Sequence, residues 1–77
     1  MGEGLSEFIT KNIDERKVLT GVGVLVFCIA RDGSLNADAV IEALNNLVES
    51  ERVKRAYEDR AFSRGPLGAQ TYYISLK

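Results

Sequence analysis

The chain has 77 residues, a formal net charge of −1, one cysteine, and neither histidine nor tryptophan. This length predicts a single domain over residues 1–77, and one cysteine cannot form a disulfide within the chain. Without histidine, a metal site or a catalytic thiol would rest on Cys28 and carboxylates alone, so we expect no cofactor, no metal site and no enzymatic activity.

An amphipathic helix is predicted over residues 5–16. One face of this helix carries four large apolar side chains, Leu5, Phe8, Ile9 and Ile13. In so short a chain this apolar stripe needs cover, and a second subunit is the natural source of it. We therefore predict a homodimer with Leu5, Phe8 and Ile9 in the interface.

A second helix is predicted over residues 18–30, which read VLTGVGVLVFCIA. A membrane-spanning helix needs about 20 apolar residues, and no cleavage pattern follows, so we expect a cytoplasmic protein that does not enter the membrane. Valine and isoleucine favour a strand here, whereas the length of the run favours a helix. Gly21 and Gly23 would let a neighbouring helix approach closely, and Cys28 would be a buried hydrophobe. The alternative is a central strand in a different α+β domain.

A third helix is predicted over residues 37–50. Asn36 is a suitable N-cap, and Asp38 in the first turn is favoured by the helix dipole. The inward stripe is formed by Val40, Leu44, Leu47 and Val48. The opposite side carries acidic and amide side chains: Asp38, Glu42, Asn45, Asn46 and Glu49.

Two strands are predicted over residues 52–60 and 70–76, separated by the loop sequence SRGPLGA. The second strand is half-buried, because Tyr72, Ile74 and Leu76 alternate with more polar neighbours. An isolated hairpin is not stable in water, so this one must pack on the helices. The predicted fold class is α+β, with three helices followed by a two-stranded hairpin.

Charge is distributed unevenly along the chain. Residues 1–51 hold four basic and nine acidic side chains, a net charge of −5, whereas residues 52–77 hold six basic and two acidic, a net charge of +4. The split indicates either a charged partner for the C-terminal third or an attraction between the two parts of the protein.

The stretch ALNNLVESERVKRAYEDR, together with RGPLGAQTYYISL, resembles the winged helix-turn-helix superfamily, and most of all the PadR and MarR-type regulators. The matching positions are Ala43, Leu44, Leu47, Val53, Arg55, Gly65, Pro66, Gly68, Tyr72 and Tyr73. The resemblance covers residues 36–77 and implies a small winged helix with a β-hairpin wing. The chain departs from the family pattern at Glu51, where a glycine usually ends the helix, so we expect the turn there to lack a left-handed cap.

The resemblance implies contact with double-stranded DNA. Base reading would fall to Asn45 and Asn46, because asparagine can bond to adenine. The cations placed to contact phosphate are Arg52, Lys54, Arg55, Arg60 and Arg64. The carboxylates of the helix over residues 37–50 would repel phosphate, so the alternative is a winged-helix module that binds a protein partner through this acidic helix.

Overall fold

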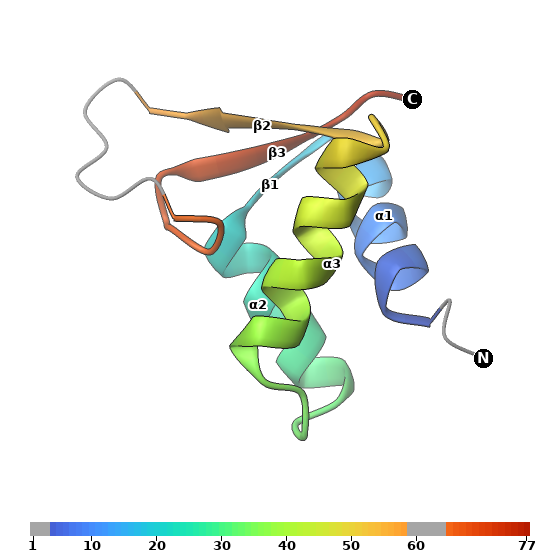
Figure 1. The fold of residues 1–77 in the computed structure, drawn as a ribbon, viewed down its shortest axis with the longest axis vertical. Coiled ribbons are helices and arrows are strands. Elements are labelled where there is room, and N and C mark those ends of the chain that lie inside the picture. Colours follow the sequence, from blue (N-terminus) through green and yellow to red (C-terminus); the bar gives the residue numbers. More distant parts are fainter. Residues whose placement is uncertain (1–3, 59–64) are drawn as a thin grey trace.

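The computed structural model describes residues 4–58 and 65–77. Its elements are α1 (Gly4–Arg16), β1 (Val18–Thr20), α2 (Gly21–Arg31), α3 (Ala37–Glu49), β2 (Val53–Tyr57) and β3 (Thr71–Ser75). The three helices gather on one side of the three strands (Figure 1). The protein is therefore a small α+β domain with three helices and an antiparallel sheet.

The sheet has one strand more than the predicted two-stranded hairpin. Its order is β1-β3-β2, and β3 pairs antiparallel with both neighbours. Residues 18–20, predicted as the first turn of a helix, form the added strand, with Val18 opposite Ile74. The helix begins only at Gly21, because Thr20 is its N-cap and accepts a hydrogen bond from the Gly23 backbone N–H at 3.0 Å.

The core lies between the helices and the helix-facing side of the sheet. Its buried apolar residues are Ile9, Ile13, Val24, Cys28, Val40, Ala43, Leu44, Leu47, Val53 and Tyr73. Cys28 is buried, as predicted, and burial raises the pKa of its thiol against a smaller opposing effect of Arg31. Every helix and two of the strands thus contribute to one continuous core.

The helix-facing side of β3 carries hydroxyl groups that anchor the chain around it. Thr71 Oγ1 donates to the Gly65 carbonyl at 2.8 Å, and Ser75 Oγ donates to Asp14 Oδ1 at 2.6 Å. Gly21 permits a further close approach, since a Cβ there would lie 2.5 Å from the carbonyl oxygen of Pro66. The close neighbour of Gly21 is therefore the chain before β3, and the expected close helix packing at this glycine is wrong.

The turn after α3 has the left-handed cap that the sequence was expected to lack. Glu51 takes a φ of 61°. The Arg52 backbone N–H donates to the Leu47 carbonyl at 3.0 Å, and the Glu51 N–H donates to the Val48 carbonyl at 3.1 Å. A glutamate in this conformation is less stable than a glycine by about 1 kcal/mol. The cap turns the chain directly into β2.

Candidate nucleic-acid interface

The outward face of α3 is polar along its whole length. Its exposed polar side chains are Asp38, Glu42, Asn45, Asn46 and Glu49. Asn36 fixes where the helix begins, because its Oδ1 accepts a hydrogen bond from the Ala39 backbone N–H at 2.9 Å. The opposite stripe of α3 packs into the core. The helix therefore presents amide and carboxylate groups to solvent.

A hydrogen-bonded cluster joins α3 to the sheet. Arg55, on β2, donates from Nη2 to Oδ1 of Asn45 and from Nε to the hydroxyl of Tyr73 at 3.1 Å. The Tyr73 hydroxyl donates in turn to the Pro66 carbonyl at 2.7 Å. Arg55 also lies over the Tyr73 ring, with its Cζ 5.4 Å from the ring centroid. The cluster fixes Asn45 and the Arg55 guanidinium beside each other at the α3 surface.

Tyr73 supports this cluster from inside the protein. Its side chain is buried, and burial raises the pKa of its hydroxyl, while Arg55 acts in the opposite direction. The hydroxyl therefore stays protonated at neutral pH and can donate to Pro66. Sequence reasoning missed this role. The signal for it is register, because Arg55 and Tyr73 are cross-strand partners and their side chains share one face of the sheet.

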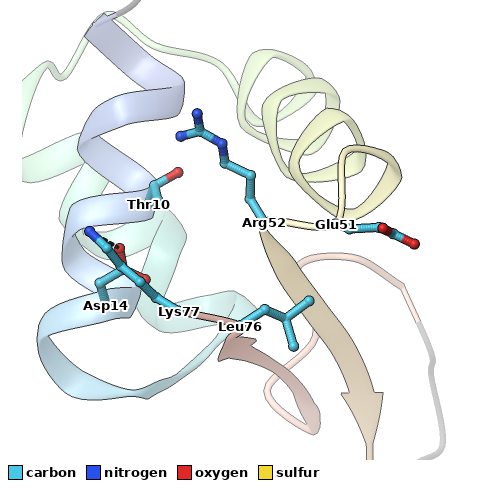
Figure 2. Close-up of a pocket in the computed structure, with 6 residues that line it drawn as sticks. All are labelled: Thr10, Asp14, Glu51, Arg52, Leu76 and Lys77. Atoms are coloured by element: carbon cyan, nitrogen blue, oxygen red, sulfur yellow. Dashed lines mark ion pairs between the residues drawn. The ribbon is translucent and has the colours of Figure 1, made fainter.

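Arg52 stands at the edge of an open groove between α1 and the end of α3. The groove has a volume of about 310 Å³ and is lined by Thr10, Asp14, Glu51, Arg52, Leu76 and Lys77. Figure 2 shows the Arg52 side chain reaching over the groove while Glu51 points away from it. Asp14 is already engaged by Ser75 and lies 3.8 Å from the Lys77 ammonium. Within residues 4–58 and 65–77, no carboxylate pairs with the Arg52 guanidinium, which leaves it available to an anion.

The remaining predicted contact residues lie on different sides of the α3–β2 junction. Asn46 borders a hollow that it shares with Arg52 and the first turns of α1, whereas Asn45 faces Arg55. Lys54 is exposed and alternates with Arg55 along β2, so its side chain leaves from the face of the sheet that points away from the helices. Arg60 and Arg64 lie outside the described residues.

The predicted dimer residues on α1 are largely used within the chain. Ile9 is only 1 % exposed and belongs to the core, so it offers almost no surface to a second subunit, and its place in a dimer interface stays a prediction. Leu5 and Phe8 are partly buried against the same core. Arg31 covers this end of α1, with its Cζ 4.8 Å from the centroid of the Phe8 ring. The stripe on α1 therefore has its cover without a second subunit.

The described residues contain no cluster of three or more His, Cys, Asp or Glu side chains that could hold a metal ion. None of the helices in that part of the chain is long and apolar enough to cross a membrane. Comparisons with models of protein families, with curated proteins and with solved structures found no match.

Proposed function

We propose that the protein is a small winged-helix DNA-binding protein of the transcription-regulator type. In this proposal α3 enters the major groove, α1 and α2 are the two upstream helices, and β2 and β3 are the strands of the wing. Three helices followed by a paired β2 and β3 agree with the resemblance carried by residues 36–77. The observation that carries the proposal is the cluster that holds Arg55 beside Asn45 on the exposed face of α3.

Because of the cluster, the two asparagines present different hydrogen-bonding groups to a DNA base. The Asn45 carbonyl oxygen already accepts from Arg55, so what this pair offers outward is mainly N–H donors. Donors match the N7 and O6 acceptors of guanine in the major groove, whereas adenine presents one acceptor and one donor. We assign guanine to Asn45 and Arg55, and adenine to Asn46, which can both donate and accept.

Arg52 and Lys54 supply the phosphate contacts within the described residues. Both side chains belong to exposed residues next to the C-terminal end of α3. Each phosphate that a protein cation neutralises contributes a slope of about −0.9 to the dependence of log K on log salt. The carboxylates of Asp38 and Glu42 lie nearer the other end of α3, whereas Glu49 and Glu51 lie close to Arg52 along the chain. Arg52 and Lys54 must therefore outweigh these two carboxylates where the start of β2 faces the phosphates.

The test is a titration of labelled random-sequence duplex DNA, followed by fluorescence anisotropy at about 50 and 200 mM salt. We expect binding that falls steeply with salt and falls further in the double variant Arg52→Gln, Lys54→Gln. Lys17→Gln is the matched control, because Lys17 precedes β1 at the other edge of the sheet. Arg55 is unsuitable for this arm, since its substitution also breaks the bond to Tyr73.

Equal affinity for the double variant and the parent would overturn the assignment of the phosphate contacts. Absence of binding at the lower salt would overturn the DNA proposal itself. The second candidate function is then a winged-helix module that docks a basic protein partner on the acidic face of α3. The exposed carboxylates of Asp38, Glu42 and Glu49 favour it.

A further inference from the structure

The helix α2 leaves part of its apolar surface exposed. Only Gly21, Val24 and Cys28 are buried along it. On the opposite side, Val22 is 40 % exposed, Val26 is 56 % exposed and Ile29 is 45 % exposed. These three residues are spaced by four and by three, so their side chains line one outward strip of the helix. A helix that is apolar on all sides is normally covered on all sides, and this strip has no cover within the described residues.

The strip itself carries no charged side chain. Of the two arginines near α2, Arg31 turns toward α1, whereas Arg16 reaches from α1 onto α2 at Phe27, which is not one of the three strip residues. Arg31 donates from Nη1 to the Gly4 carbonyl at 3.0 Å and lies over the Phe8 ring. Arg16 lies over the Phe27 ring, with its Cζ 4.4 Å from the centroid. Any surface that covers the strip must therefore be apolar and neutral itself, since a charged or polar partner group would lose its water without gaining a hydrogen bond.

The distribution of charge points to a second copy of this chain as the occupant. A two-fold axis places a surface against itself, so like charges on that surface would meet each other. The outward side of α1 carries exposed Glu7, Lys11 and Glu15, and that of α3 carries the three carboxylates described above. Of the three helices, α2 alone has an outward strip on which self-association brings no charges together, and the net charge of −1 adds little long-range repulsion.

We propose that the protein forms an isologous dimer through α2. The two α2 helices pack antiparallel, with Val26 close to its own copy at the axis and Val22 beside Ile29 of the second copy. The strip from Val22 to Ile29 is only about two helical turns long. The area that it can bury is therefore well below the roughly 800 Å² per partner of a standard interface. The dimer is therefore weak and depends on concentration. α2 and α3 face each other through the core, so the dimer leaves the outward face of α3 free.

Sedimentation equilibrium across the micromolar range tests this proposal. For the wild-type chain, we expect the apparent mass to rise from 8.5 kDa toward twice that value. Val26→Glu places two carboxylates at the axis and should remain a monomer with an unchanged circular dichroism spectrum. Ala37→Glu adds the same charge at an exposed position of α3 and should dimerise like the wild type. A wild-type monomer at the highest concentration, or a Val26→Glu chain that dimerises normally, would overturn the proposal.

Disulfide trapping gives a second test that does not depend on a loss of binding. Val26→Cys should form a disulfide-linked dimer under mild oxidation, because the two positions meet at the axis. The native Cys28 is fully buried and does not compete. Ala37→Cys is the control for random collision between exposed thiols. Cross-linking of Val26→Cys that is no faster than that of Ala37→Cys would place the axis elsewhere and overturn the proposal.

Discussion

The helices α2 and α3 are neighbours of similar length, with 11 and 13 residues, yet their outward faces are opposites. α3 exposes carboxylates and amides, whereas α2 exposes valine and isoleucine. Both helices bury an apolar stripe in the same core, so fold stability alone explains the inward side of each. The difference lies outside the core. It agrees with the two proposals, a polar ligand on α3 and an apolar partner on α2.

The strongest contrast between the helices is expected from truncating one apolar side chain on each. Leu44→Ala removes a fully buried side chain of α3 and should lower the free energy of unfolding by about 2–5 kcal/mol. Val26→Ala removes an exposed side chain of α2 and should change it by less than about 0.5 kcal/mol. Urea unfolding at a concentration where the chain is monomeric measures both. A loss at Val26 as large as that at Leu44 would mean that the strip is covered within one chain.

The next effect concerns the beginning of α2. In Gly21→Ala, the added methyl group would meet the Pro66 carbonyl oxygen and the Cα of Leu67, which would lie 2.5 Å and 2.8 Å away. Backbone atoms cannot move aside cheaply, so we expect a loss of about 1–3 kcal/mol in the free energy of unfolding. Gly33→Ala is the control, because its nearest neighbour would be 3.9 Å away. Equal stability of the two variants would contradict the close approach of α2 to the chain before β3.

A smaller effect is expected where the sheet supports α3. Tyr73→Phe removes the hydroxyl that bonds to Arg55 and Pro66, at an expected cost of about 1–2 kcal/mol in unfolding free energy. It also frees the Arg55 guanidinium from one of its anchors. We therefore expect weaker discrimination between guanine-rich and guanine-free duplexes, measured by anisotropy, with the salt dependence unchanged. Unchanged discrimination would show that Tyr73 does not position Arg55.

The same hydroxyl makes stability depend on alkaline pH. Burial raises the pKa of folded Tyr73 above its ordinary value of 10.0. As pH rises, the unfolded chain releases this proton first, so the contribution of Tyr73 is fully present below pH 10.0 and is lost as pH climbs through the folded pKa. Urea unfolding from neutral to alkaline pH should show a smaller loss in Tyr73→Phe than in the wild type. An equal loss in both would contradict this assignment.

The smallest effect is expected at the end of α3. Glu51→Gly relieves the left-handed conformation and should raise the free energy of unfolding by about 0.5–1 kcal/mol. Glu51→Ala removes the same charge and keeps the strained φ, so it should bring no such gain. If Glu51→Gly and Glu51→Ala raise the free energy of unfolding by the same amount, the gain comes from removing the charge. The left-handed conformation then carries no strain.

The sequence predicted α3 well because its polar residues mark the exposed side. The buried stripe through Leu44 follows from the 3.6-residue period, and Asn36 as the N-cap follows from its side-chain oxygen, which can accept from a backbone N–H. α2 has no polar residue before Arg31, so periodicity could define neither its exposed side nor its first residue. The strand β1 was missed because Val18 and Leu19 extend the apolar run across Thr20. The signal that could have separated them from the helix is Thr20 itself, a residue type that favours the N-cap position.

The candidate site was predicted in part. The amides on α3 and the cations after it were identified from residue type and spacing. The bond between Asn45 and Arg55 could not be, because it depends on the register of β2 against β3 and on how that sheet packs on α3. Sequence alternation places Arg55 on one side of a strand. Only the fold shows that this side meets Asn45 and Tyr73.

The most direct test of the two opposed faces is a nuclear magnetic resonance titration. Amide resonances of ¹⁵N-labelled protein would be followed as duplex DNA is added at a fixed protein concentration. We predict shifts at Asn45, Asn46, Arg52 and Arg55, and none at Val22 or Val26 beyond those that protein concentration alone produces. Shifts confined to α2, or no shifts at all, would contradict the assignment of the polar face of α3 to DNA.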